Sequence, residues 1–263
     1  MCDLQKLFSV LDELSPIELS HKLIASGDYD NSGILVKGHN QIKKVLFSLD
    51  LTFEAIRKAK RLGADTIVTH HPAIYSPIKA LDGENVISGQ VLKCAEGGIN
   101  VISMHLNLDV ANQGIDQCLC TSLGGESYKI IEYVDELFGY GREFSVKEQT
   151  LGEYVKAIRK NFATKKIIVY GNKNQKIKVV ASFCGGGSSH AEKYVLGGGV
   201  GDLIVTSDMP HHVIKELIEK DKKIILLPHY VAEEIGFRNY FDRATKALGG
   251  IVETCYFDDK RFR

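Results

Sequence analysis

The sequence predicts an α/β protein with two related αβ halves, each a mostly parallel or mixed sheet flanked by helices. Apolar runs typical of strands alternate with amphipathic segments typical of helices, and this order builds parallel sheets. One stretch is repeated, because GADTIVTHHP at residues 63–72 aligns with VGDLIVTSDMP at residues 200–210 and shares IVT with it. We place the halves at residues 1–131 and 132–263, with residues 132–152 as the crossover between them.

In the first half, capping residues and apolar runs set the expected elements. Thr52 is a favoured N-cap and Gly63 a favoured C-terminal residue, so together they bound a helix. The expected elements are helices at 1–11, 16–25 and 53–62, a turn at 38–41, and strands at 43–49, 65–69 and 99–103.

The second half repeats this order around a glycine-rich turn at residues 185–187. Its expected elements are strands at 178–183, 202–206 and 223–227, a helix at 188–196, and a helix that starts near His229. Histidines follow the strands of both halves, at positions 70, 71, 105 and 229. Ligands of parallel sheets gather at the carboxyl ends of the strands, so these histidines are candidate site residues.

Composition excludes several classes of protein. Lys and Arg together number 33, as do Asp and Glu, so the net charge is zero and we expect no nucleic-acid partner. No apolar run approaches the ~20 residues of a membrane-spanning helix, and the start of the chain does not resemble a signal peptide. Six cysteines without a CxxC spacing indicate reduced thiols. We therefore expect a cytoplasmic protein without a membrane segment.

His70 and His71 stand directly before Pro72. Adjacent residues of a continuing strand point to opposite faces, but a proline ends the strand and lets both imidazoles turn into one cavity. The alternative is a pair of surface or packed histidines that bind nothing.

Two other motifs place an imidazole and a carboxylate four residues apart, where one helical turn brings them to one face. They are His105 with Asp109 and His229 with Glu233. In the alternative interpretation, Asp109 caps a helix at residues 111–119, and Glu233 is an acidic residue near the positive end of a helix.

Taken together, these residues exceed the ligand set of one tetrahedral ion and suit a pair of divalent ions with a bridging carboxylate. The predicted ligands are His70, His71, Asp109, His229 and Glu233. Nitrogen and oxygen donors without a thiolate suit Zn, Fe, Mn, Ni or Co. Such a pair would hold a hydroxide near neutral pH and stabilise charge on the group attacked, which is hydrolytic chemistry.

Weaker signals surround this set. His105 is a spare imidazole, and His212 follows the second-half strand as His71 follows the first, so both are candidate catalytic residues, His212 as a proton shuttle. Alternatively, Asp208 caps a helix whose histidines are exposed. The glycine-rich turn after Cys184 is either an anion site or a tight turn, and we interpret Cys184 as structural.

The motifs resemble those of the Nif-three-like family, which is also known as DUF34 or as GTP cyclohydrolase type-two homologues. They are DNSGILV, THHP, HLNLD, FCGGGSS, VTSDMPHH and HYVAEE, in family order over about nine-tenths of the chain. The resemblance implies the duplicated Nif-three-like fold, a dinuclear metal centre on the five ligands named above, and toroidal hexamers built as trimers of dimers. The chain departs from the family pattern at Pro228, Ser207 and Tyr29, and lacks the ferredoxin-like insert of longer relatives.

We therefore expect a metal-dependent hydrolase that acts on a small molecule of unknown identity, such as a nucleotide or a GTP-like compound. Both halves would contribute to one metal site, and the chain would assemble with itself. The alternatives are a metal-delivery protein and a regulatory protein that binds metal without turnover.

Overall fold

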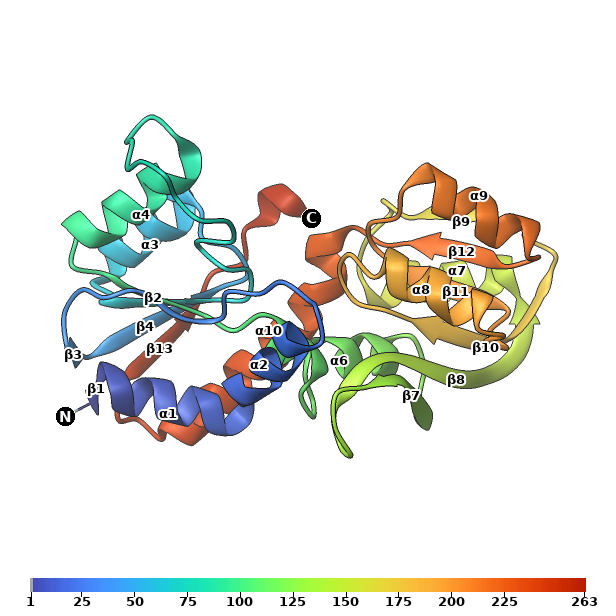
Figure 1. The fold of residues 1–263 in the computed structure, drawn as a ribbon, viewed down its shortest axis with the longest axis horizontal. Helices are drawn as coiled ribbons and strands as arrows, with labels where there is room; N and C mark the ends of the chain where they lie inside the picture. Colours follow the sequence, from blue (N-terminus) through green and yellow to red (C-terminus); the bar gives the residue numbers. More distant parts are fainter. Residues whose placement is uncertain (1) are drawn as a thin grey trace. The chain divides into compact units, whose positions relative to one another are not determined.

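The computed structural model describes residues 2–263, which divide into two units (Figure 1). Unit 1 takes in the chain up to Ala111 together with Phe237–Arg261, and unit 2 takes in Asn112–Gly236 together with Phe262–Arg263. Helix α10 (His229–Leu248) begins in unit 2 and ends in unit 1. The halves predicted from the sequence, 1–131 and 132–263, have other bounds than these two units. They describe an internal duplication and remain a prediction.

Within the described residues, unit 1 holds a five-stranded sheet in the order β13-β4-β5-β6-β2. The strands are β13 (Glu253–Tyr256), β4 (Lys44–Ser48), β5 (Thr66–Thr69), β6 (Asn100–Ser103) and β2 (Gly33–Val36). All neighbours pair in parallel except β2, which runs antiparallel to β6. The other elements of this unit are β1 (Cys2–Asp3), β3 (Gln41–Ile42), α1 (Leu4–Leu14), α2 (Ile17–Ala25), α3 (Phe53–Leu62), α4 (Val86–Glu96) and α5 (Leu106–Val110).

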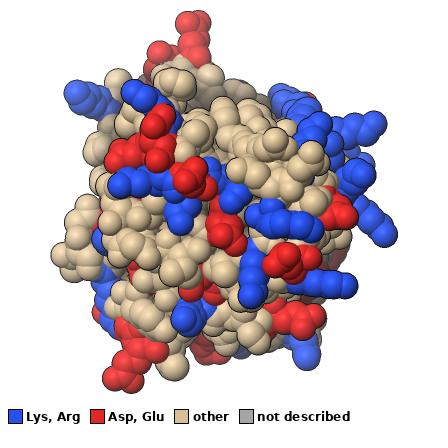
Figure 2. Space-filling model, turned by 90° about the vertical axis from the view of Figure 1, so that its right-hand side faces the viewer, with Lys and Arg blue, Asp and Glu red and all other residues tan. Residues whose placement is uncertain are grey.

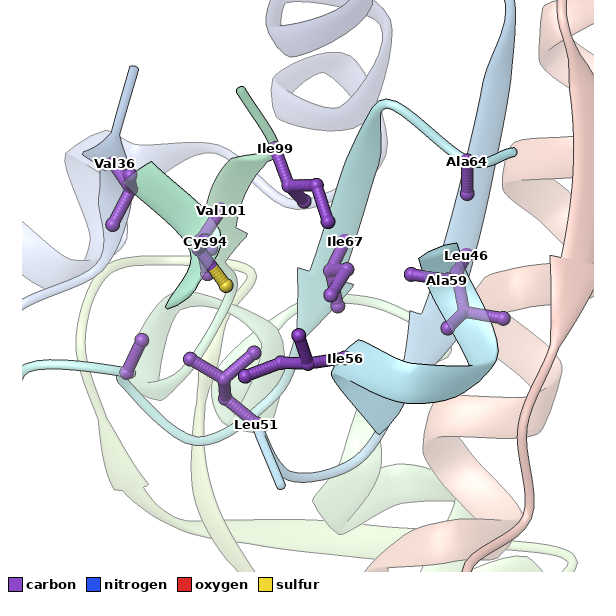
Figure 3. Close-up of a cluster of buried hydrophobic side chains, with 11 residues drawn as sticks. Val36, Leu46, Leu51, Ile56, Ala59, Ala64, Ile67, Cys94, Ile99 and Val101 are labelled. Atoms are coloured by element: carbon purple, nitrogen blue, oxygen red, sulfur yellow. The ribbon is translucent and has the colours of Figure 1, made fainter. Parts of the chain in front are cut away.

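The central strands of unit 1 are buried on both faces, which explains why they read as continuous apolar runs. On one face, Leu46 of β4 packs with Ile56 of α3 and Cys94 of α4 in the cluster that Figure 3 shows. On the other, Phe47 lies 5.3 Å, centroid to centroid, from Phe241 of α10. Because side chains alternate along a strand, helices pack on both faces of β4. This packing fixes the position of Ser48, where the strand ends.

Unit 2 holds a six-stranded mixed sheet in the order β7-β8-β10-β11-β12-β9 in the part of the chain described. The strands are β7 (Tyr128–Tyr133), β8 (Gly139–Thr150), β10 (Lys176–Ser182), β11 (Leu203–Thr206), β12 (Lys223–Leu226) and β9 (Ile168–Tyr170). The three strands β10, β11 and β12 are parallel and the others pair antiparallel. The helices are α6 (Ile115–Ser122), α7 (Leu151–Asn161), α8 (Ser188–Leu196) and α9 (His211–Glu219). A 3-10 helix near the end of the chain (Lys260–Phe262) has residues in both units.

The fold prediction is confirmed, since each unit contains a parallel strand-helix-strand-helix-strand run. In unit 1 the run is β4-α3-β5-α4-β6, and in unit 2 it is β10-α8-β11-α9-β12. The apolar side chains of the second run, among them Phe183, Ile204 and Leu217, form the core of unit 2. The matching order agrees with the repeat that the sequence predicts.

One expectation and one alternative interpretation about single elements are wrong. Residues 132–152 are not a crossover, because most of them lie in the antiparallel hairpin of β7 and β8. This hairpin is half-exposed, so its apolar residues alternate with polar ones and form no apolar run. The helix expected at residues 111–119 begins instead at Ile115, with Gly114 as its N-cap, and Asp109 lies inside α5.

Both signs of charge occur over the face that Figure 2 draws, in keeping with the net charge of zero. None of the helices in residues 2–263 has a long enough apolar stretch to cross a bilayer. All six cysteines are thiols and none forms a disulfide. Burial raises the pKa of Cys94 and Cys120 to about 12, so these two thiols are unreactive near neutral pH.

Candidate metal centre

His70 and His71 follow the end of β5, and the backbone turns sharply at this point. The amide N–H groups of both residues donate to the carbonyl oxygen of Leu49, at 3.0 and 3.1 Å. Their ring centroids are therefore only 4.9 Å apart, where a continuing strand would have sent them to opposite faces. One ring nitrogen each of His70, His71 and His105 lies within 4.8 Å of the others, so these three residues form a group that fits a metal ion.

His70 is fully buried and its tautomer is set by the backbone. Its Nδ1 lies 2.8 Å from the carbonyl oxygen of Met104, which can only accept, so Nδ1 carries the proton. The lone pair of Nε2 is then directed toward Asp109, whose Oδ1 is 3.4 Å away. Asp109 reaches this place because α5 makes one turn after His105, with the amide of Asp109 donating to the His105 carbonyl at 3.0 Å.

The other two histidines of this cluster are held by carboxylates. His71 Nδ1 donates to Asp50 Oδ1, and His105 Nδ1 donates to Asp30 Oδ1, each at 2.7 Å. Burial works to raise the pKa of Asp30, but hydrogen bonds from His105 and from the hydroxyls of Ser20 and Ser32 outweigh it and lower the pKa to about 2. Asp30 is therefore ionised at neutral pH and keeps the proton of His105 on Nδ1.

In unit 2 the first turn of α10 forms a second small cluster. His229 Nδ1 donates to Asp208 Oδ2 at 2.5 Å, and His229 Nε2 lies 3.0 Å from Glu233 Oε1. Glu233 is buried, while its neighbour Glu234 pairs with Arg263 at 2.7 Å. The alternative role for Asp208 is wrong, because Pro210 is the N-cap of α9 and Asp208 binds His229 instead.

The glycine-rich turn lies against this second cluster. Gly185 has a φ of +56°, and a Cβ there would lie 2.5 Å from Glu233 Oε1 and 3.4 Å from His229 Nε2. Only glycine gives both this backbone conformation and this space. The turn therefore packs directly against the cluster.

Buried side chains beneath the turn fix its position. Asp116 Oδ1 accepts from the amide of Cys184 at 3.1 Å, and Asp116 Oδ2 accepts from Arg142 Nη1 at 2.9 Å. Tyr140 donates its hydroxyl to the Cys184 carbonyl. Burial raises the pKa of Asp116 to about 6, and Arg142 limits the rise.

The donor set fits divalent ions. In each of His70, His71, His105 and His229 the Nδ1 is engaged by an acceptor, which leaves Nε2 as the nitrogen with the lone pair. Ligand atoms bound to one ion at ~2.1 Å and at angles of ~90–110° lie about 3.0–3.4 Å from each other. The His70–Asp109 and His229–Glu233 separations, 3.4 and 3.0 Å, both match.

Unit 1 thus brings together His70, His71, His105 and Asp109, and unit 2 brings together His229 and Glu233. His212 is exposed on α9, as is His211. Asp30 and Asp50, which hold His105 and His71, were not among the predicted site residues. A signal was present for Asp50, because it follows the end of β4 as the histidines follow the neighbouring strands.

Comparisons with known proteins agree with this fold. A family model described as Duf34/NIF3 (NGG1p interacting factor 3) matches residues 2–260. A Clostridium perfringens protein named GTP cyclohydrolase 1 type 2 homolog is 28% identical over 235 residues, 88% of this chain and 86% of its own. A Lactococcus lactis protein of the same name is 30% identical over 206 residues, 77% of this chain and 78% of its own. The crystal structure of a Bacillus cereus protein related to NIF3 matches with a TM-score of 0.87 at 18% identity, covering 97% of this chain and 96% of that one.

Proposed function

The chain belongs to the Duf34/NIF3 family, and on that premise we propose that it is a dinuclear metal-dependent hydrolase. Both halves of the chain would contribute to one shared centre, whose two divalent ions are Zn, Fe, Mn, Ni or Co. The proposed ligands are His70, His71, Asp109, His229 and Glu233. His105 is proposed to transfer protons, and the same role for the exposed His212 stays a prediction.

The observation that carries this proposal is the way the histidines are held. Metal-bound histidines generally donate their other ring N–H to a carboxylate or a carbonyl, which fixes the ring and its tautomer. His71 and His229 do so to Asp50 and Asp208, and His70 does so to the Met104 carbonyl. Histidines outside the site also pair with acids, as His190 does with Glu132 at 3.2 Å. The support for ligands therefore comes from this pattern together with the grouping of His70, His71 and His105.

Helix α10 carries both the proposed ligand Glu233 and a residue that contacts His70. Glu233 and Phe237 are four residues apart on this helix and therefore lie on one face of it. Phe237 belongs to unit 1, where its ring centroid lies 6.2 Å from that of His70.

When bound, two divalent ions would supply Lewis acidity and lower the pKa of a bound water toward neutrality. The chain's own residues supply the rest. Asp109 and Glu233 are buried carboxylates, which are stabilised by neighbouring cations. His105 presents Nε2 as a proton acceptor while ionised Asp30 stabilises the imidazolium that forms, as a carboxylate does in other acid-base pairs.

The proposed substrate is a small molecule with a hydrolysable bond. Relatives carry the name GTP cyclohydrolase 1 type 2 homolog, which makes a nucleotide or a GTP-like compound one candidate. The chain has no Walker-type phosphate loop, so the reacting group is expected to be bound by the metal cluster itself.

Turnover with a panel of phosphoester, amide and nucleotide substrates tests the proposal. Metal-loaded wild type should hydrolyse at least one class, and Asp109→Ala should reduce kcat/KM by at least about 100-fold, because a proposed ligand is removed. Asp28→Ala, at an exposed aspartate of the same unit, serves as the control. If loaded wild type hydrolyses nothing but releases its metal to an apo-metalloprotein, metal delivery is the function instead.

A further inference from the structure

Two exposed tyrosines lie beside the histidine cluster of unit 1. The ring centroid of Tyr75, in the loop after β5, is 6.2 Å from that of His105, with the ring planes at 89°. Tyr29 contacts Tyr75 edge to face at 4.9 Å. The two residues are 51% and 47% exposed, for Tyr29 and Tyr75 respectively. Large rings left open to solvent next to a polar cluster mark a binding surface.

Hydrogen bonds hold the Tyr29 ring and the backbone that carries Tyr75. The Tyr29 hydroxyl donates to the Tyr75 carbonyl, and Asn31 Nδ2 donates to the Ile74 carbonyl, each at 2.6 Å. Asp30, between Tyr29 and Asn31, binds His105. One short segment therefore fixes the aromatic pair and an imidazole of the cluster together. Rings held in advance lose little conformational entropy when a ligand binds.

We propose that Tyr29 and Tyr75 form a stacking platform for a flat, conjugated ring in the substrate, placing its reacting group at the histidine cluster. The inference rests on the proposed function, because it names the class of substrate for that same centre. Tyrosine faces attract either planar rings or cations. Two bound divalent ions close to Tyr75 would repel a cation, so a neutral or anionic ring is the ligand that fits.

Two hydroxamates test the platform, because a hydroxamate binds zinc while the group attached to it can be chosen. Benzohydroxamate carries a flat ring, and cyclohexanecarbohydroxamate carries a puckered ring of the same size. Zinc-loaded wild type should bind benzohydroxamate about tenfold more tightly by calorimetry, the usual scale of aromatic stacking. Tyr75→Ala should remove this preference, and Tyr75→Phe should keep it. Tyr133→Ala, at an exposed tyrosine of β7, is the control and should keep it too.

Fluorescence gives a second readout. The chain has no tryptophan, so Tyr75→Trp introduces a single indole. Benzohydroxamate should quench its emission and cyclohexanecarbohydroxamate should not, whereas the indole of Tyr133→Trp should respond to neither. This measurement also reports on the platform if Tyr75→Ala fails to fold.

The outcomes separate the platform from the metal centre. If the protein takes up zinc but binds the two hydroxamates equally, with no response from Tyr75→Trp, the platform is wrong and the metal centre stands. If the protein takes up none of Zn, Fe, Mn, Ni and Co, the proposed function is wrong and the platform, which depends on it, is wrong with it.

Discussion

At the scale of single residues, the account depends on how each imidazole is held. Asp50 accepts a hydrogen bond from Nδ1 of His71 at 2.7 Å, which leaves the lone pair of Nε2 to bind a metal. The His71 side chain is 28% exposed, so without this hydrogen bond its ring could rotate or change tautomer.

The substitution Asp50→Ala should therefore lower zinc affinity by about 10- to 100-fold, the usual cost of losing such a partner. Asp50→Asn should have a smaller effect, because the amide oxygen still accepts the proton although the charge is gone. Competition with a fluorescent chelator measures both. Asp28→Ala is the control, and equal affinities for Asp28→Ala and Asp50→Ala would show that Asp50 does not position His71.

At this scale the candidate ligands were largely predictable from the sequence, but the aspartates that hold them were not. Histidines and acids at strand ends stand out in the sequence, and the structure brings His70, His71, His105 and Asp109 together. The partners of Asp30 and Asp50 could not be read from the chain alone. Asp30 precedes β2 and Asp50 follows β4, and an aspartate at such a place has many ordinary roles, such as capping a helix. Their role appears only when the partner histidine, 75 or 21 residues away, is placed beside them.

At the scale of elements, the glycine turn after β10 combines a positive φ with close contact to a proposed ligand. Gly185→Ala should destabilise unit 2 by about 1–2 kcal/mol, because alanine is strained at positive φ. It should also weaken zinc binding, because its Cβ would displace Glu233 Oε1. Denaturant unfolding and chelator competition measure the two effects.

Gly186→Ala is the matched control for this turn, since a Cβ at Gly186 meets nothing within 4 Å. Its stability and zinc affinity should stay close to those of wild type. If the two variants behave alike, the turn has no special relation to Glu233.

Helix α7 begins with a capping box that predicts a pH dependence. The Thr150 backbone N–H and hydroxyl both donate to Glu153, which lowers the pKa of Glu153 below its ordinary 4.5. A lowered acid pKa stabilises the fold above the ordinary pKa, and this contribution is lost as the pH falls through the folded value. Thr150→Ala should raise the Glu153 pKa, as followed by NMR, and destabilise the helix by about 1 kcal/mol. An unchanged Glu153 titration would contradict the capping box.

Local elements were predicted well and distant pairings were not. The helices at 53–62 and 188–196 match α3 and α8 to the residue, because caps and glycines mark their ends. Strand β13 was missed because its partner is β4, so that Glu253 pairs with Lys44 from the opposite end of the chain. No local pattern encodes such a pairing. It also explains why the C-terminal segment belongs to unit 1.

At the scale of the whole molecule, each unit has its own core, and helix α10 carries residues of both. The family resemblance predicts that chains assemble as a hexamer, a trimer of dimers. Native mass spectrometry should then find six chains of 29.1 kDa, about 175 kDa in all. A monomer or dimer at micromolar concentration would contradict this assembly and leave the metal centre to be judged separately.

The metal content of the purified chain tests the central claim most directly. After loading and removal of excess ion, elemental analysis should find two divalent ions per chain of wild type. His71→Ala and His229→Ala should each bind fewer ions, because each removes a proposed ligand. One of these ligands lies in unit 1 and the other in unit 2. Two ions in wild type with a loss in both variants is the result the account predicts. No bound ion in wild type, or full loading in either variant, would contradict it.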